Sequence, residues 1–347
     1  MSRRLRHRTA ARPPCGKNAG VPDEEENLET QRFSRTGLDI TRIGFGSWAV
    51  GGSGWFGGWG SQDDQDSIGA IHRAVENGVN WVDTAAVYGL GHSEEVVAQA
   101  LKGVPDNDRP YVFTKCELVW DEDGNVGNSL KADSVKRECE ASLRRLNVEA
   151  IDLYQIHWPN PDEDIEEGWG AMAELKKEGK VRHIGVSNFN VGQLKRAEAV
   201  APVETLQPPY SMLNRGVEGE TLPYCRENGI GVINYSPMFS GLLTGKMDKE
   251  RAESLPEDDW RSRHPEFQEP NLSRNLDLVE ALREVGAAHG GKSPGEVAIA
   301  WTLRNPAITA AIVGGRRPDQ VDGVVGAADL ILDDSEIDRM ESLLQSS

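Results

Sequence analysis

Four side chains capable of acid–base chemistry stand at or just after the ends of three successive apolar stretches. Asp83 and Tyr88 follow the stretch at residues 81–82, Lys115 ends the next one, and His157 ends the third. A tyrosine hydroxyl is a weak acid, and it can protonate a carbonyl oxygen if a nearby cation favours the phenolate. Lys115 would supply that cation, and Asp83 would keep the buried lysine charged. His157 would hydrogen-bond the substrate oxygen, so the four residues predict proton transfer to a carbonyl that receives a hydride.

None of the four residues indicates a site by itself. An isolated aspartate at a strand end most often caps a turn, and an isolated tyrosine most often packs. A single lysine is usually solvated, and a histidine among apolar residues is usually a hydrogen-bonded core group. The hypothesis rests on their combination, because the carboxyl ends of parallel barrel strands converge on one face, where active sites lie. This chemistry requires no metal, and we expect no metal site.

The elements that position these residues follow an alternating pattern, which predicts an α/β fold. Eight short apolar stretches are expected to form strands, at residues 43–48, 81–83, 111–115, 151–157, 181–186, 203–206, 231–235 and 308–313. Helical patterns separate them, and residues 241–274 form a long polar insertion of irregular structure. Eight strands are what a closed (β/α)8 TIM barrel needs, so we predict a single barrel domain over residues 34–347. An open doubly wound sheet is the alternative, because periodicity alone does not distinguish the two.

The composition argues against several classes of protein. The formal net charge is −18, and the body of the chain contains no basic patch of the kind that binds nucleic acid. This acidity fits either simple solubility or a salt-adapted host. No apolar run is long enough to span a membrane. The four cysteines, at positions 15, 116, 139 and 225, show no paired metal or redox spacing, so we expect a reducing, cytoplasmic setting.

Residues 1–33 are predicted to be a disordered N-terminal tail. The first twenty residues contain six lysines and arginines and no acid, and they contain no apolar segment typical of a secretory signal. An organelle transit peptide is one alternative, although Pro13 and Pro14 would interrupt its amphipathic helix. A wrongly assigned start codon is another.

Three segments of the chain resemble signatures of the aldo-keto reductase family. They are Asn80–Gly89, Asp152–Trp158 and Ile184–Phe189, and the resemblance extends over about residues 33–345. It is closest to the bacterial branch with inositol-utilisation and general-stress members, and to the branch of potassium-channel β-subunits. The resemblance implies a barrel that binds NADP(H) and uses Asp83, Tyr88, Lys115 and His157 as its catalytic residues.

By this resemblance the dinucleotide lies across the mouth of the barrel. Two other glycine motifs do not fit nucleotide sites. Residues 44–49 are followed by more glycines instead of a helix, and residues 241–246 are one residue short of a P-loop. The residues that we expect to bind the cofactor are Ser47, Trp48, Asp83, Ser187, Asn188, Gln207, Tyr235, Ser236, Met238, Ser240, Gly241, Leu242, Lys246, Gly314, Arg316, Arg317 and Gln320.

The resemblance also assigns roles within this set. Ser187, Asn188 and Gln207 match groups that bind the nicotinamide carboxamide, and Tyr235 matches a ring stacked on the nicotinamide. Ser236 to Leu242 would hold the pyrophosphate, and Lys246 would meet a phosphate. Arg316 and Arg317 follow the last strand, where barrels often bind phosphate, and two fixed cations suit an adenosine 2′-phosphate. This favours NADP(H) over NAD(H), although Val324 stands where relatives carry asparagine.

The substrate pocket is expected to be aromatic and polar, with Trp48, Tyr88, Trp120, His157 and Trp158 as its walls. Such walls suit aldehydes, ketones, sugars or polyols, and the fold does not choose among them. The glycine-rich loop at residues 51–60 is either a mobile lid or a turn pinned by its tryptophans. No feature indicates an oligomeric state.

Two other classes of function are compatible with a barrel. One is a nucleotide-binding redox sensor or accessory protein with secondary turnover, which an intact set of four catalytic residues does not exclude. The other is a metal-dependent or phosphosugar-processing barrel, which needs carboxylates or histidines at several strand ends. Only Asp83 and His157 meet that requirement here.

Overall fold

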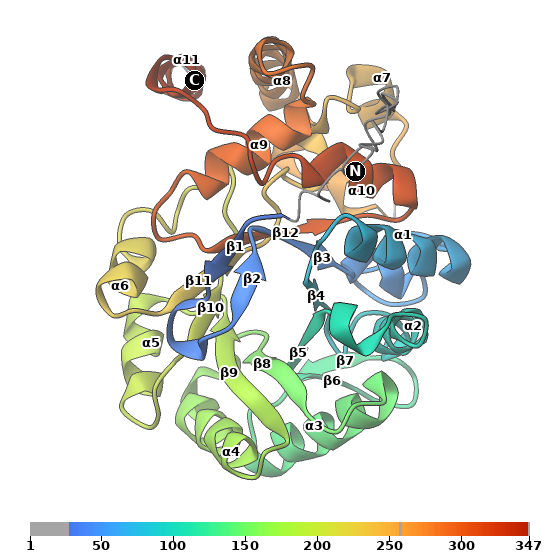
Figure 1. The fold of residues 1–347 in the computed structure, drawn as a ribbon, viewed down its shortest axis with the longest axis vertical. Coiled ribbons are helices and arrows are strands. Elements are labelled where there is room, and N and C mark those ends of the chain that lie inside the picture. Colours follow the sequence, from blue (N-terminus) through green and yellow to red (C-terminus); the bar gives the residue numbers. More distant parts are fainter. Residues whose placement is uncertain (1–27, 257–258, 346–347) are drawn as a thin grey trace, which may run out of the picture.

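The computed structural model describes residues 28–256 and 259–345, and its centre is a closed barrel of eight parallel strands (Figure 1). Strand β12 pairs with both β11 and β3, so the last and first barrel strands close the ring. The predicted TIM barrel is confirmed, and the open-sheet alternative is wrong. The barrel strands are β3 (Ile43–Gly46), β4 (Trp81–Asp83), β5 (Tyr111–Cys116), β8 (Ile151–Ile156), β9 (Val181–Ser187), β10 (Thr205–Gln207), β11 (Gly231–Asn234) and β12 (Ala310–Gly314).

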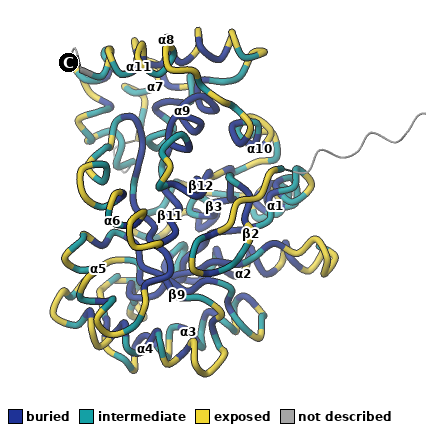
Figure 2. The backbone as a smooth tube through the Cα atoms, turned by 60° about the vertical axis from the view of Figure 1, so that its left-hand side comes forward, coloured by how far each residue is buried: buried dark blue, intermediate teal, exposed yellow. Residues whose placement is uncertain are grey.

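Helices surround the barrel, and buried residues line the space between the two layers (Figures 1 and 2). Their starts carry capping residues. Asp63 accepts hydrogen bonds from the N–H groups of Gln65 and Asp66, and Asn190 and Ser293 each form a capping box. The described helices are α1 (Asp64–Glu76), α2 (His92–Leu101), α3 (Ala132–Leu146), α4 (Ile165–Lys177), α5 (Val191–Glu198), α6 (Thr221–Glu227), α7 (Lys249–Glu253), α8 (Asn271–Ala288), α9 (Pro294–Leu303), α10 (Pro318–Val325) and α11 (Asp334–Gln345).

An antiparallel hairpin of β1 (Thr30–Arg32) and β2 (Asp39–Thr41) precedes the barrel. Phe33 and Ile40 of this hairpin are fully buried in a cluster with side chains from inside the barrel, among them Trp81. The tail predicted over residues 1–33 therefore ends too late in the chain, because residues 28–33 belong to the ordered fold. Residues 1–27 of that predicted tail lie outside the described residues.

Two further segments differ from the expectation. The connection after β5 contains a hairpin of β6 (Leu118–Trp120) and β7 (Val126–Asn128), which the periodicity did not indicate. The insertion predicted as irregular over residues 241–274 contains α7, and α8 begins within it at Asn271. Its apolar side chains, among them Leu242 and Phe267, pack together in a small core of their own.

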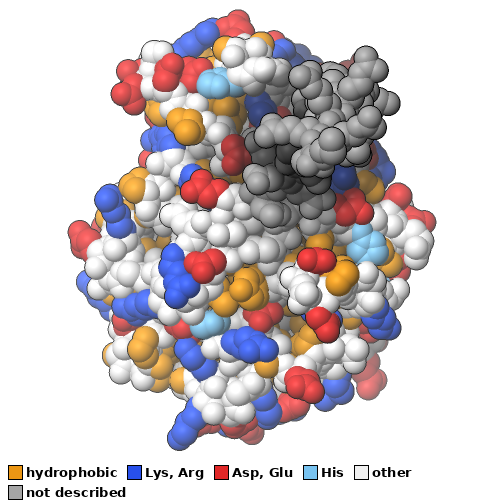
Figure 3. Space-filling model, in the orientation of Figure 1, with side chains coloured by type: hydrophobic (Ala, Val, Ile, Leu, Met, Phe, Trp, Pro, Cys, Tyr) orange, Lys and Arg blue, Asp and Glu red, His pale blue; other side chains and the backbone are white. Residues whose placement is uncertain are grey.

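The surface carries charges of both signs. Acidic and basic side chains are interspersed over the face shown in Figure 3, and many of them pair. Arg196, for example, lies 2.6 Å from both Asp162 and Glu166. Pairing of this kind offsets charges locally, while the net charge of −18 remains negative. Among the described helices, none has the length and apolar character that crossing a membrane would require.

Candidate active site

A cavity of about 900 Å³ lies at the carboxyl ends of the barrel strands. Asp83 is the last residue of β4, Lys115 lies near the end of β5, and His157 directly follows β8. Tyr88 stands in the turn between β4 and α2. Three of these four residues line the cavity, and Lys115 lies beneath them, fully buried. The predicted catalytic residues therefore come together in space.

A buried ion pair forms the base of the site. Lys115 Nζ lies 2.5 Å from Asp83 Oδ1 and also donates to the Thr84 carbonyl at 2.8 Å. Burial lowers the pKa of Lys115, and the charges of Asp83 and Glu94 act in the opposite direction. The other Asp83 oxygen accepts from the Gln207 amide at 2.9 Å and from Gln155 at 3.3 Å. The hydrogen bonds leave the Asp83 carboxylate with little freedom to move.

Tyr88 lies above this ion pair, with the Lys115 ammonium 5.4 Å from the centre of its ring. Burial raises the pKa of Tyr88 well above its usual value, and the negative charge of Asp83 adds to the rise. The pKa of Tyr88 is therefore shifted away from the phenolate form, and the stabilisation of a phenolate by Lys115 stays a prediction. Tyr88 is protonated at neutral pH, which is the form that can donate a proton to a carbonyl oxygen.

His157 is the second group able to contact an oxygen placed above Tyr88. The two rings meet edge to face, with their centres 5.8 Å apart. Burial lowers the pKa of His157 well below its usual value, and the charge of Lys115 lowers it further. The imidazole is therefore neutral at pH 7, and one ring nitrogen can donate a hydrogen bond while the other accepts.

Beside the predicted catalytic residues, Asn188 and Tyr235 form a polar wall of the cavity. The Tyr235 hydroxyl donates to Asn188 Oδ1 at 2.9 Å, and the Asn188 amide donates to the His157 carbonyl at 3.0 Å. Ser187 Oγ donates to the Gln207 carbonyl at 2.7 Å, which ties β9 to β10. Amide and hydroxyl groups of this kind suit a carboxamide of the ligand.

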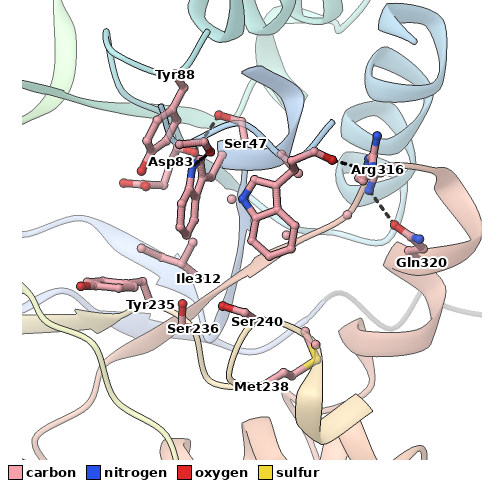
Figure 4. Close-up of a pocket in the computed structure, with 18 of the residues that line it drawn as sticks. Ser47, Asp83, Tyr88, Tyr235, Ser236, Met238, Ser240, Ile312, Arg316 and Gln320 are labelled. Atoms are coloured by element: carbon pink, nitrogen blue, oxygen red, sulfur yellow. Dashed lines mark hydrogen bonds between the residues drawn. The ribbon is translucent and has the colours of Figure 1, made fainter. Parts of the chain in front are cut away.

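The loop after β11 forms the next part of the wall (Figure 4). Ser236, Ser240 and Gly241 all have positive φ angles, of 56°, 51° and 91°. Within the described part of the chain, the backbone N–H groups of Ser240 and Gly241 have no acceptor. Unpaired N–H groups in a tight turn are suited to binding an anion. Leu242 does not line the cavity as predicted, because its side chain is fully buried in the small core of the insertion.

Arg316 lies on the side of the cavity away from Tyr88 (Figure 4), and Arg317, Lys246 and Arg261 also line the cavity. The Arg316 guanidinium donates to Gln62 Oε1 at 2.5 Å and to the Ser61 carbonyl, and its backbone N–H donates to Gln320 Oε1 at 2.7 Å. Burial lowers the pKa of Arg316, and the charges of Arg317 and Arg261 lower it further. Arg317 pairs with Asp319 and Arg261 pairs with Asp259, whereas Arg316 forms no ion pair within the described residues, so an anion beside Arg316 would offset its charge.

Comparison with known proteins extends this description. The model of the aldo/keto reductase family matches residues 42–345. The chain belongs to the aldo/keto reductase family. Members of this family are oxidoreductases that bind nicotinamide cofactors.

Individual relatives cover nearly the whole of this aldo/keto reductase. Aldo-keto reductase YhdN of Bacillus subtilis (strain 168) is 39% identical, over 86% of this chain and 88% of that protein. The NADH-specific methylglyoxal reductase of Escherichia coli (strain K12) is 33% identical, over 90% and 97%. The structure of glycerol dehydrogenase AKR11B4 from Gluconobacter oxydans superposes with a TM-score of 0.82 at 36% identity, over 93% and 96%.

The position of Trp120 in this aldo/keto reductase corrects one sequence prediction. Trp120 does not line the cavity, because it belongs to the β6–β7 hairpin and its ring lies under the Arg145 guanidinium at 5.7 Å. Apart from Leu242, the other residues predicted for the cofactor do line the cavity, although Arg317 also pairs with Asp319.

Several lining residues were absent from the sequence prediction. Gln62 and Arg261 come from loops far apart in the chain, and Arg261 lies over the Trp59 ring at 5.1 Å. Nothing in the polar insertion singled out Arg261, since its role depends on contacts between distant segments. Gln155 was also absent from the prediction. It does not line the cavity but donates a hydrogen bond to Asp83, and it lies within the segment 152–158 that carried the family resemblance.

Proposed function

We propose that this aldo/keto reductase is an NADP(H)-dependent enzyme that interconverts a carbonyl and an alcohol, with Tyr88 as general acid and base. The observation that carries the proposal is that one cavity joins Tyr88 and His157 at one end to Arg316 and Arg317 at the other. A proton donor and a phosphate site in one cavity are what a hydride-transferring dinucleotide enzyme requires.

The residues present fit a nicotinamide dinucleotide. A volume of about 900 Å³ accommodates a large elongated ligand together with a small substrate. Asn188 and Gln207 offer amide groups beside Tyr88, the loop at Ser240 and Gly241 offers unpaired N–H groups, and Arg316 offers a positive charge. This order of groups along the cavity matches carboxamide, pyrophosphate and adenosine phosphate.

When bound, the nicotinamide supplies or accepts the hydride. The protein's own residues handle the proton and the oxygen. Tyr88 donates its hydroxyl proton to the carbonyl oxygen in reduction and recovers it in oxidation. His157 donates a hydrogen bond that fixes the direction of that oxygen, and Lys115 stabilises the negative charge left on Tyr88. Asp83 keeps Lys115 charged in spite of its burial.

The preference for NADP(H) rests on the cations at the adenosine end. Arg316 and Arg317 line the cavity there, together with Lys246 and Arg261. A 2′-phosphate adds a dianion that only NADP(H) carries, and guanidinium groups bind such a group with two hydrogen bonds. Several carboxylates lie nearby as well. Asp63 and Asp66 line the cavity, Arg317 pairs with Asp319 and Arg261 pairs with Asp259, so the cations must outweigh these charges.

The purified protein and its Tyr88→Phe variant test the proposal. NADPH and a panel of carbonyl compounds that includes methylglyoxal and small hydroxyketones are mixed with each, and the absorbance of the reduced nicotinamide is followed. We expect turnover by the wild type and a fall in kcat of at least 10²-fold in the variant, with unchanged NADPH affinity, because only the proton donor is lost. Equal kcat values would refute the role of Tyr88. NADPH binding without turnover of any carbonyl would favour a redox sensor. The cytoplasmic location expected from the sequence is a separate prediction, which this assay does not address.

A further inference from the structure

Glu117 has an unusual combination of burial and backbone conformation. It follows Lys115 by two residues, its side chain is fully buried, and its φ angle is 94°. That conformation is favoured by glycine and costs free energy for any residue with a side chain. Strain of this kind persists where surrounding contacts fix it, and it concentrates at functional sites.

The contacts of Glu117 join several segments at the carboxyl end of β5. One carboxylate oxygen accepts from Asn128 Nδ2 at 2.5 Å, and the other accepts from the backbone N–H of Trp158 at 3.1 Å. Its own N–H donates to the Glu138 carboxylate of α3 at 2.8 Å, and its carbonyl accepts from the N–H of Ser129 at 2.9 Å. Glu117 therefore holds the β6–β7 hairpin, α3 and the segment after β8 together.

The bond to Trp158 bears directly on the substrate end of the cavity, which we define as the part lined by Tyr88, His157 and Trp158. The N–H of His157 donates to the Cys116 carbonyl at 3.1 Å, and the next N–H donates to Glu117. The N–H groups of His157 and Trp158 are thus held by the consecutive residues Cys116 and Glu117. These bonds determine the direction in which the chain leaves β8, and with it the place of the His157 and Trp158 rings, which stack at 6.4 Å.

A buried carboxyl is a costly way to hold one backbone N–H. Burial raises the pKa of Glu117 to about 8, and the charge of Glu138 adds to the rise against the hydrogen bonds from Asn128 and Trp158. A glycine would adopt the same φ angle without strain but would leave both donors without an acceptor. Glu117 therefore destabilises the fold, and its hydrogen bond with the Trp158 N–H determines the position of Trp158.

We propose that Glu117 is a positioning residue for the carbonyl substrate, which acts by holding the His157–Trp158 segment against the cavity. This inference rests on the proposed carbonyl–alcohol activity. Glu117 does not line the cavity itself, so it influences the reaction through the two residues that do. Arg316 and Gln320 lie on the side of the cavity away from Tyr88 (Figure 4), and none of the hydrogen bonds of Glu117 within the described residues reaches them.

Three variants test the proposal. Glu117→Gly removes the acceptor and relieves the backbone strain, whereas Glu117→Gln keeps an oxygen that can accept from Trp158. Glu204→Gln is the matched control, because Glu204 is a buried carboxylate that accepts a backbone N–H, from Ile184, at the amino end of β10. The measurements are KM and kcat for the carbonyl, the dissociation constant of NADPH, and hydrogen exchange at the Trp158 amide.

For Glu117→Gly we expect the carbonyl KM to rise about tenfold and the Trp158 amide to exchange about tenfold faster, as the loss of one buried hydrogen bond implies. NADPH affinity should stay the same. Glu117→Gln should restore KM to within about twofold of the wild-type value, and Glu204→Gln should leave it unchanged.

The proposal is overturned if Glu117→Gly leaves KM or the Trp158 exchange rate unchanged, or if Glu117→Gln is as impaired as the glycine variant. A wild-type protein that turns over no carbonyl would refute the proposed function instead. The exchange rate of Trp158 would still decide in that case whether Glu117 holds this segment.

Discussion

At the scale of single residues, the site depends on charges that are buried together. Lys115 and Asp83 are almost completely buried, and neither would be stable alone in that environment. Their pairing, with amide donors to the second Asp83 oxygen, places a fixed cation beneath Tyr88. Tyr88 meanwhile keeps its proton at neutral pH, because burial raises its pKa. The protein thus combines a phenol that keeps its proton with a buried ammonium group beneath it, as the proposed reaction requires.

Replacing Arg316 by alanine tests the assignment of the adenosine end at the same scale. We expect the KM for NADPH to rise about tenfold or more in Arg316→Ala, because a charge-assisted pair with a phosphate is lost. The KM for NADH should change much less, since NADH lacks the 2′-phosphate. Steady-state kinetics with both cofactors measure the difference, and equal effects on the two would remove Arg316 from any role in cofactor choice.

At the scale of elements, the loops after β3 and β4 pack against each other through glycines. A Cβ atom added at Gly51 would lie 2.7 Å from the backbone nitrogen of Gly89 and 2.8 Å from the carbonyl carbon of Tyr88. The absence of side chains therefore lets the two loops approach and fixes the height of Tyr88 above Lys115. Trp55 of the 51–60 loop packs beside Tyr88 as well, with the two ring centres 5.9 Å apart.

Gly51→Ala should consequently displace Tyr88 and leave the barrel folded. We expect kcat/KM to fall by about 10- to 100-fold, because small displacements of a catalytic group are costly. Gly219→Ala is the control, since a Cβ at Gly219 meets no atom within 4 Å. Kinetics and circular dichroism on both variants make the comparison, and wild-type activity in Gly51→Ala would show that this close contact does not position Tyr88.

The packing of α3 against β5 predicts a dependence of stability on pH. Burial raises the pKa of Glu138 to about 7, although the charges of Arg137 and Arg145 act in the opposite direction. Burial also raises the pKa of Glu117, to about 8. A carboxyl whose pKa is higher in the folded state binds its proton more tightly there. Its stabilising contribution is therefore complete below the unfolded pKa, about 4.3, and is lost as the pH rises through the folded value.

Glu138→Gln removes one of the two titrating groups and tests this prediction. Between about pH 4 and pH 7, the free energy of unfolding of the wild type should fall relative to that of the variant, by roughly 1–3 kcal/mol, and the difference should be level above pH 7. Denaturant titrations at several pH values measure it. Parallel pH profiles for the two proteins would mean that Glu138 titrates normally.

At the scale of the whole molecule, the residues that line the cavity and the residues of the β1–β2 hairpin that stabilise the core lie in different parts of the barrel. The cavity lies at the carboxyl ends of the strands, and the β1–β2 hairpin packs its apolar side chains into the barrel interior. Phe33 stacks on Phe113 with ring centres 6.2 Å apart and is fully buried. Since β1 and β2 contribute no residue to the cavity, the hairpin serves the core alone.

Phe33→Ala should lower the free energy of unfolding by about 3–5 kcal/mol, as expected for removal of a buried aromatic ring. The kcat of the folded variant should stay within about twofold of wild type, because the cavity residues are untouched. Leu38→Ala, at a partly buried position of the same cluster, should cost less. Thermal and denaturant unfolding measure these effects, and a stable but inactive Phe33→Ala protein would contradict this separation.

The sequence by itself predicted a (β/α)8 barrel and singled out four candidate catalytic residues, which the structure brings together. Strand and helix periodicity are local properties, and parallel barrel strands bring their ends together, so residues at the ends of three strands could be assigned to one site. The tertiary structure decided the rest. Trp120 turned out to pack under Arg145, Leu242 to be buried, and Gln62 and Arg261 to reach the cavity. These outcomes depend on how loops from distant parts of the chain pack against one another, and no local pattern encodes such contacts.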